Sequence, residues 1–390
     1  MRDVRLIVGA VGLSAAGDTV LWVLLALHVG TTVDSALAVS ALFICLWGPV
    51  VALGGVAGRL VDSHENRRLL IAVSLAQAAV VVAMAFTTGS LPVLLALCLL
   101  LGAGVAVASP AEFALVPAAA GEERVALANG QVEAARYLGM TAGPLIGGAL
   151  AGAGLTHVGL LIDAASFVAV AIAALALHAR RHPHAHAAPT RSRDGIQALV
   201  RDRTLAIAMA AAIASLLFFT ISVSAEVFFA TEVLETGATG YGVLMGAWTL
   251  GMVAGAIGLA RLVPTRWLAA GAMAGIAVQG LGLFGAAVGA TVALALLGFL
   301  IGGVAHGAKN VLLRTLIHER VPEAQRGRAY AAYNAARNGA ELAALGAGGV
   351  LVGLAGAQLA LAVSGALPLA IGLGTLLLII PAPRRRPAYA

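Results

Sequence analysis

The chain has 390 residues, of which 61% are hydrophobic and 11% are charged, and its mean hydropathy is +0.97. A soluble domain carries about 25% charged residues, so this composition excludes an ordinary soluble protein. The net charge of +6 does not indicate a nucleic-acid-binding protein. Its basic residues flank apolar segments and form no face that is interleaved with aromatic residues.

Apolar segments of membrane-spanning length follow one another along the whole chain. A helical span needs about 20 apolar residues, and at about 32 residues for a span and its loop the chain holds about twelve. We therefore predict an all-α membrane protein with twelve transmembrane helices. Their predicted ranges are 6–29, 37–60, 69–88, 91–112, 126–152, 156–177, 205–231, 240–260, 267–288, 291–313, 328–354 and 357–381.

Lysine and arginine occur at every second gap between these segments. The gaps near 30–36, 89–90, 153–155, 232–239, 289–290 and 355–356 contain neither residue. The other gaps and both ends of the chain hold almost all of them. Because basic residues stay on the cytoplasmic side of a membrane, we expect a multi-pass protein of the cell membrane with both termini in the cytoplasm.

One long polar stretch, 178–203, separates two halves of the chain. We predict a six-helix bundle in 1–177, a cytoplasmic linker in 178–203 and a second six-helix bundle in 204–390. The second part of the linker is expected to form a short amphipathic helix at the membrane surface. His178, His182, His184 and His186 lie in it without a cluster of carboxylates or cysteines. We interpret them as part of a solvated basic linker and predict no metal site.

The two halves resemble each other at an offset of 201 residues. Glu122 then corresponds to Glu323, and Arg136 corresponds to Arg337. Two six-helix halves have the same orientation in the membrane, so this is a parallel repeat. That arrangement is typical of major facilitator transporters, in which the halves are related by an axis along the membrane normal.

Ionisable residues inside spans are costly and indicate a cavity, a partner or a transport pathway. Asp18 lies near the middle of the first helix and has no basic residue one turn away. Proton or substrate binding and a static packing hydrogen bond are both open for this residue. Asp163 and Glu226 are placed in the outer parts of their helices, where each is either protonated from outside or exposed at the rim.

Two further charged pairs occupy equivalent helices of the two halves. Glu133 and Arg136 are three residues apart, and Arg337 and Glu341 are four apart, so each pair shares a helix face. Each pair either neutralises itself or offers its arginine to a central cavity. The repeat favours Arg136 and Arg337 as cavity residues.

A glycine stripe runs along the fifth predicted helix. It consists of Gly139, Gly143, Pro144, Gly147 and Gly148. Small residues at this spacing let a neighbouring helix approach closely, so the stripe predicts a packed helix seam. It is similar to the fifth-helix motif of drug/proton antiporters in the major facilitator superfamily.

Two other segments carry the same resemblance. The segment Gly58 to Arg68 resembles the superfamily's G-x-x-x-D-R-x-G-R-R loop, with Gly58, Asp62 and Arg67 in place, followed by Arg68. In the family, the aspartate helps to close the cytoplasmic side, which implies a loop gate here. Ser63, Glu65 and Asn66 depart from the pattern. Gly17-Asp18, followed by Ser35-Ala-Leu-Ala-Val, resembles the macrolide and siderophore efflux branch.

The resemblance implies a secondary transporter and no enzyme. We expect export of small organic molecules such as drugs, siderophores or metabolites, driven by the proton gradient and linked to multidrug resistance. The chain has no G-x-x-x-x-G-K-[ST] run, so no nucleotide or other cofactor is expected. The expected partners are a small-molecule substrate and the lipid bilayer, without nucleic acid, and the protein is expected to be monomeric. A uniporter, importer or lipid flippase is the alternative, and a transport-inactive sensor is a weaker one.

Overall fold

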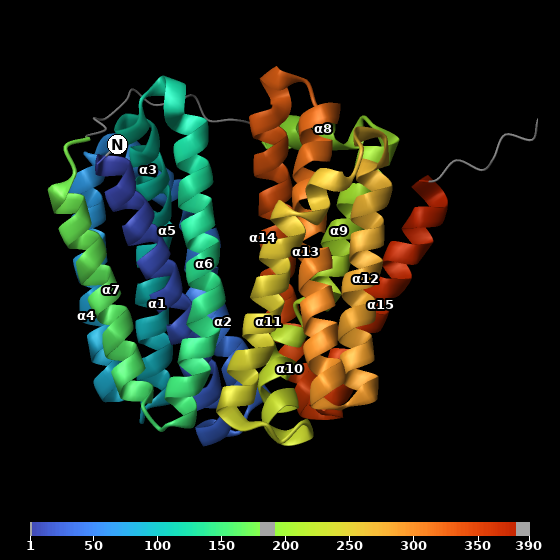
Figure 1. The fold of residues 1–390 in the computed structure, drawn as a ribbon, viewed down its shortest axis with the longest axis horizontal. Coiled ribbons are helices and arrows are strands. Elements are labelled where there is room, and N and C mark those ends of the chain that lie inside the picture. Colours follow the sequence, from blue (N-terminus) through green and yellow to red (C-terminus); the bar gives the residue numbers. More distant parts are fainter. Residues whose placement is uncertain (1, 180–191, 380–390) are drawn as a thin grey trace, which may run out of the picture. The chain divides into compact units, whose positions relative to one another are not determined.

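The computed structural model describes residues 2–179 and 192–379, and every regular element within these ranges is a helix (Figure 1). The first part contains α1 (Arg2–Val33), α2 (Ala36–Ala52), α3 (Gly54–Ser63), α4 (Asn66–Thr87), α5 (Leu91–Ala120), α6 (Val125–Gly152) and α7 (Thr156–Ala176). The second contains α8 (Ser192–Val200), α9 (Arg203–Phe219), α10 (Ser222–Phe228), α11 (Gly237–Ile257), α12 (Leu268–Gly289), α13 (Val292–Arg320), α14 (Glu323–Ala355) and α15 (Ala357–Ile379).

The described helices have the length and composition of membrane spans. Ten of them could cross a membrane, and α2 with α3 forms an eleventh that is bent by 53°. Helix α6 adds a further 28 residues that carry Glu133 and Arg136. The predicted all-α membrane fold is confirmed, and these helices are consistent with twelve spans in two bundles.

The second predicted span, 37–60, is wrong as a single helix. The chain breaks at Leu53 between α2 and α3. Pro49 has no backbone N–H, so one hydrogen bond of the helix is missing just before the break. Gly54 and Gly55 follow the break, and glycine backbone adopts more conformations than that of other residues, which lets the chain change direction there. Helix α3 then continues to Ser63, so Gly58 and Asp62 lie on a helix and not in a loop.

Several helices extend beyond the predicted ends. Helix α5 continues to Ala120 instead of residue 112, and Gly121 ends it with a φ of 74°. Helix α13 reaches Arg320, and α14 begins at Glu323. Polar residues at these ends lower the local hydropathy without ending the helix, and Glu112 therefore lies inside α5.

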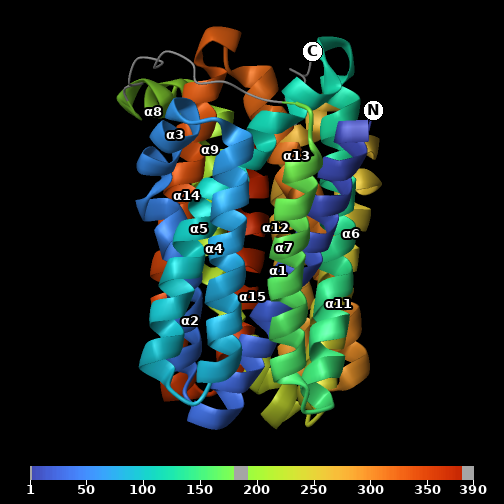
Figure 2. The same cartoon turned by 90° about the vertical axis from the view of Figure 1, so that its left-hand side faces the viewer.

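The described chain divides into two compact units. Unit 1 contains residues 2–179 with Val223–Thr249 and Leu345–Ala357, and unit 2 contains residues 192–222, Leu250–Ala344 and residues 358–379. Within unit 1, α1 packs along α6 and α7, and α4 packs along α5 and α7 (Figure 2). Within unit 2, α12 and α13 lie side by side. Two segments of the second half, Val223–Thr249 and Leu345–Ala357, thus pack with the first half. The predicted domain boundaries at residues 177 and 204 stay a prediction.

A short helix occupies the described part of the linker. Helix α8 buries Ala198 and Leu199 in the apolar core of unit 2 and exposes Ile196 and Val200. The amphipathic helix is confirmed, and its place at a membrane surface stays a prediction. Before the gap, His178 donates its backbone N–H to the Asp3 carboxylate at 2.8 Å. His182, His184 and His186 lie outside the described residues.

Candidate functional site

The glycine stripe of α6 forms a close-packed seam with α1. A Cβ on Gly139 would lie 2.8 Å from the backbone nitrogen of Ala16, and one on Gly143 would lie 2.7 Å from the Ala16 carbonyl oxygen. Both distances are too short for a real side chain, so glycine lets the two backbones meet. A Cβ on Gly147 would lie 3.1 Å from the Val20 carbonyl oxygen. Helix α6 runs unbroken through Pro144.

The next glycine of the stripe faces another helix of unit 1. A Cβ on Gly148 would lie 2.6 Å from the Cα of Gly242 on α11. Elsewhere in unit 1, the Ser40 and Ser224 hydroxyls share a hydrogen bond of 2.7 Å between α2 and α10, and both side chains are buried. These contacts tie residues 223–249 to the first helices of the chain.

The α1–α6 seam places Asp18 beside a second carboxylate. Gly17 leaves room for the side chains of Asp163 and Ser166 on α7, because a Cβ at Gly17 would overlap both. Asp163 is 0% exposed, and its Oδ1 accepts a hydrogen bond of 3.2 Å from Ser166. The rim placement considered for Asp163 is therefore wrong. The position of a residue along its helix does not determine whether its side chain is buried. The Asp163 side chain is buried because it packs against α1 at Gly17.

Glu226 is also buried. It lies on α10 and is 8% exposed, so the exposed rim position is wrong for this residue too. It does not line the pocket that contains Asp18. A role for Glu226 in the transport pathway stays a prediction.

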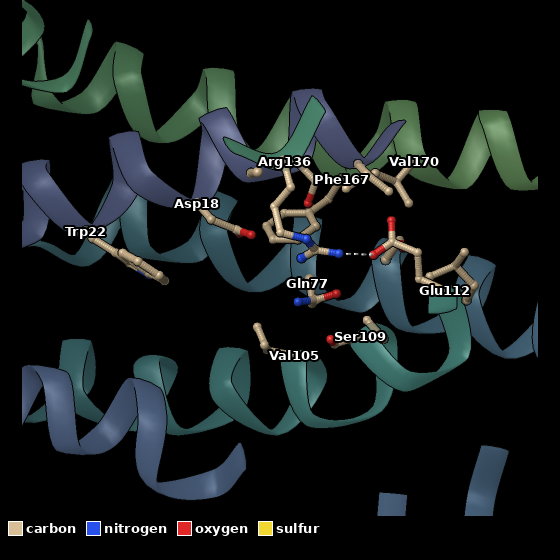
Figure 3. A pocket seen from close by; sticks show the side chains of 15 residues that line it. Asp18, Trp22, Gln77, Val105, Ser109, Glu112, Arg136, Phe167 and Val170 are labelled. Carbon is tan, nitrogen blue, oxygen red and sulfur yellow. Dashed lines mark ion pairs between the residues drawn. The ribbon is translucent and has the colours of Figure 1, made fainter. Parts of the chain in front are cut away.

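Asp18 opens into a pocket that lies inside unit 1, between α1, α4, α5, α6 and α7. This N-terminal pocket has a volume of about 180 Å³. The hydroxyl, amide and charged side chains that line it are Ser14, Asp18, Ser74, Gln77, Ser109, Glu112 and Arg136. Figure 3 shows Arg136 reaching between Asp18 and Glu112, with Gln77 on the other side of the guanidinium group.

The arginine of this pocket lies near two glutamates, Glu112 in the pocket and Glu133 outside it. The Arg136 Nη2 lies 3.7 Å from Glu112 Oε2, and its Nε lies 3.8 Å from Glu133 Oε1. Its guanidinium carbon also lies 4.9 Å from the centre of the Phe113 ring. The predicted local pair of Glu133 and Arg136 is present. It is shared with Glu112, so the arginine is not neutralised within its own helix alone.

Two pocket residues were missed by the sequence reasoning. Glu112 was placed at the end of its helix, whereas α5 continues for two more turns. Gln77 has an uncharged amide in the middle of an apolar span, where burying a polar side chain costs free energy and therefore indicates a function or a partner. The sequence does contain a weak signal for Gln77, because the repeat offset of 201 residues places its counterpart one residue before another glutamine, Gln279.

Unit 2 contains its own buried polar cluster. The Lys309 ammonium donates to Gln279 Oε1 at 2.9 Å and lies 3.4 Å from His306 Nδ1. On α14, Arg337 Nη2 donates to Glu341 Oε1 at 2.8 Å, so the second predicted pair is present. Both Arg337 and Glu341 are close enough to Lys309 to interact with it electrostatically.

The segment that resembles the cytoplasmic gate has a local ion pair and also contacts α7. Arg67 Nη2 donates to the Leu175 carbonyl at 2.9 Å, near the C-terminal end of α7, where a cation is favoured. Arg68 pairs with Glu65 at 2.9 Å. Gly58 has open space where a side chain would be. This arrangement joins α4 to α7, and a gating role for Asp62 stays a prediction.

Comparisons with known proteins agree with this architecture. The family model of the Major Facilitator Superfamily matches residues 7–344. The structure of the nucleoside transporter NupG is similar at a TM-score of 0.78, with 14% identity over 98% of this chain and 100% of that chain. No curated protein sequence matches the chain significantly.

Transporters with other cargoes share the fold. A POT family transporter in complex with a thioalcohol-conjugated peptide has a TM-score of 0.76 and 11% identity over 96% of this chain and 95% of its own. A bacterial homologue of the iron transporter ferroportin has a TM-score of 0.71 and 15% identity over 97% and 99%. These likenesses show a shared fold, and the family match extends over most of the sequence. The chain belongs to the Major Facilitator Superfamily.

Proposed function

We propose that this chain is a proton-coupled secondary transporter that exports small organic molecules by alternating access. The observation that carries the proposal is the N-terminal pocket, where Asp18 and Glu112 face one guanidinium group, that of Arg136. Secondary transporters bind their cargo and coupling ion near the middle of the membrane. A polar cavity within the spans is the kind of site that this coupling requires.

The charges in the pocket give a reason for proton binding. Two ionised carboxylates and one arginine carry a net charge of −1 in a site that is largely shielded from water. A buried charge without a counter-charge is costly. Taking up one proton removes the imbalance, and losing it restores a carboxylate that can bind something else. Proton and substrate therefore compete for the same acidic groups, which is the basis of antiport.

Export is favoured over import by the sequence motifs. Gly139, Gly143 and Pro144 match the antiporter motif, and their seam holds Asp18 and Arg136 on two helices that touch through backbone atoms. Nucleoside, peptide and iron transporters share this fold, so the fold itself does not determine cargo or direction. A uniporter, an importer or a lipid flippase is the alternative, and the experiment below distinguishes proton antiport from a uniporter.

The cellular setting follows from the same proposal. A monomer in the cell membrane, with both termini in the cytoplasm, has the basic residues at the end of α13 and the start of α14 on the cytoplasmic side. The energy source is the proton gradient, without a bound cofactor. In cells, export of toxic compounds of this kind gives multidrug resistance.

The proposal is tested in proteoliposomes that contain an entrapped pH-sensitive dye. Candidate compounds are screened for proton flux that depends on the compound and on the purified protein. We expect such flux from the native protein and its loss in Asp18→Asn. Asp34→Asn is the matched control, because Asp34 is exposed, has a φ of 52° that asparagine tolerates, and lies outside the pocket. Transport that continues unchanged after the gradient is collapsed contradicts antiport and favours a uniporter.

A further inference from the structure

Gln77 is a buried amide that has no partner in the described structure. Its side chain lies on α4, is 2% exposed and lines the N-terminal pocket. Neither its Oε1 nor its Nε2 has a hydrogen-bond partner among the described residues. A buried amide without partners is costly, so this arrangement points to something that occupies the pocket. Figure 3 shows the amide group facing into the cavity.

The second half of the chain contains the same amide with a partner. Helices α4 and α12 both have 22 residues, and Gln77 and Gln279 occupy the same position along them. Gln279 Oε1 accepts a hydrogen bond of 2.9 Å from the Lys309 ammonium, and Lys309 is 3% exposed. Gln279 Nε2 has no partner among the described residues, so the oxygen is the atom that this site uses.

The internal repeat shows what the first half lacks. Counted from the first residues of α5 and α13, Lys309 corresponds to Ala108 and His306 corresponds to Val105. Ala108 and Val105 both line the N-terminal pocket. Where unit 2 has a lysine side chain that reaches its glutamine, unit 1 has an alanine and a cavity.

The surrounding charges suit a cation in the first half. Asp18 corresponds to Phe219 at the same position of α9, which packs against His306 with ring centres 5.3 Å apart. The pocket of unit 1 therefore gains a carboxylate there, and Glu112 adds a second one. Each half also keeps an arginine, Arg136 or Arg337, beside the site.

We propose that the N-terminal pocket binds a primary ammonium group of the transported molecule, in the place that the Lys309 ammonium has in unit 2. Gln77 Oε1 accepts one of the ammonium N–H groups, and the carboxylates of Asp18 and Glu112, which line the same pocket, supply the negative charge that the ammonium needs. A cavity of about 180 Å³ holds a short alkyl ammonium, since an engineered cavity of about 150 Å³ holds benzene. The inference rests on the proposed function in one respect, that the bound amine belongs to a transported substrate.

Three probes of similar size test the site in the purified protein at constant pH. They are n-propylammonium, tetramethylammonium, which has no N–H donor, and n-propanol, which has no charge. Binding is read from thermal unfolding and from tryptophan fluorescence, because Trp22 lines the pocket. We expect saturable binding of n-propylammonium at least ten times tighter than that of the other two. Equal binding of all three probes, or no binding of n-propylammonium, overturns the proposal.

Variants locate the site. Gln77→Leu is expected to weaken n-propylammonium binding at least tenfold, whereas Gln197→Leu on the exposed surface of α8 leaves it unchanged. Ala108→Lys supplies an internal ammonium, so it abolishes binding and is more stable than Ala108→Met, which fills similar space without charge. If Gln77→Leu does not fold, the comparison of Ala108→Lys with Ala108→Met tests the site instead. Normal binding in a folded Ala108→Lys protein, or in a folded Gln77→Leu protein, contradicts the assignment.

The results separate this inference from the proposed function. If proton-coupled export is found only for compounds without an amine and n-propylammonium does not bind, the ammonium site is wrong and the proposed function stands. If n-propylammonium binds as described but no compound moves protons in the liposome assay, the binding site stands and proton coupling is wrong.

Discussion

Replacing Gly143 by alanine gives a sharp test of the α1–α6 seam. The added Cβ would lie 2.7 Å from the Ala16 carbonyl oxygen and 2.8 Å from Thr19 Cβ, and it would also overlap the Thr19 hydroxyl. Two of these atoms belong to the side chain of a residue that is itself buried, and the third belongs to backbone, so the seam must open. Overpacking of this kind costs about 1–3 kcal/mol.

Gly130 on the same helix provides the matched control. A Cβ there meets nothing within 4 Å, and the residue is exposed. Alanine is favoured over glycine inside a helix, so Gly130→Ala should stabilise the protein by about 0.5–1 kcal/mol. The same substitution on one helix therefore has opposite effects at two positions, and the variants differ by about 1.5–4 kcal/mol.

The assay is thermal unfolding of the purified protein, followed by tryptophan fluorescence in one detergent for all variants. We expect Gly143→Ala to unfold below the native protein and Gly130→Ala at or above it. If Gly143→Ala unfolds at the native temperature or higher, the helices do not meet through backbone atoms at this point, and the reasoning from the stripe fails.

Three further substitutions address other contacts. Arg136→Gln removes the cation that Glu112 and Glu133 share, so it should destabilise the protein by about 1–3 kcal/mol in the same unfolding assay; a neutral result means that the pocket carboxylates are balanced in another way. Ser40→Ala, Ser224→Ala and the double variant form a cycle whose coupling should be about 0.5–1.5 kcal/mol for a buried hydrogen bond of 2.7 Å, and additive effects would contradict that bond. Asp202 caps α9 by accepting from the Leu205 N–H at 2.8 Å and pairs with Arg320. Burial raises the pKa of Asp202, but the hydrogen bonds from Leu205 and Arg320 outweigh it and lower the pKa below the ordinary value of 3.8. The contribution of this carboxylate is therefore complete above the ordinary pKa and is lost as the pH falls through the lowered one. Asp202→Ala should cost about 0.5–2 kcal/mol near neutral pH and progressively less in acid, and a cost that is the same at every pH would argue against the ion pair and the cap.

The local features of the fold could be predicted from the sequence. Segment hydropathy found the helices, and the arginines at alternate gaps predicted their alternating direction. The spacing of Gly139, Gly143 and Gly147 predicted a close approach, because glycine spacing on a helix acts directly on the neighbouring backbone. The pairs of Glu133 with Arg136 and of Arg337 with Glu341 followed from helix geometry alone.

The site depends on packing between helices, which the sequence pattern does not contain. Glu112 belongs to the pocket because α5 continues past it and lies beside α6, and neither fact follows from hydropathy. The position of Asp163 in the outer part of its helix suggested a residue at the exposed rim. Its side chain is buried because Gly17 on α1 has no side chain and leaves room for it. Gln77 carries no charge, so the sequence offers only Gln279 near the repeat offset as a weak signal, and the stronger one is its lack of partners among the described residues.

The seam also has a mechanical consequence. Helices that meet through backbone atoms cannot slide past each other without first separating, since backbone, unlike a side chain, cannot change rotamer to make way. Helices α1 and α6 should therefore move together as one rigid body during transport. Asp18 on α1 and Arg136 on α6 then keep their spacing while the rest of the pocket changes around them, so the geometry of this pair is preserved as the two helices move.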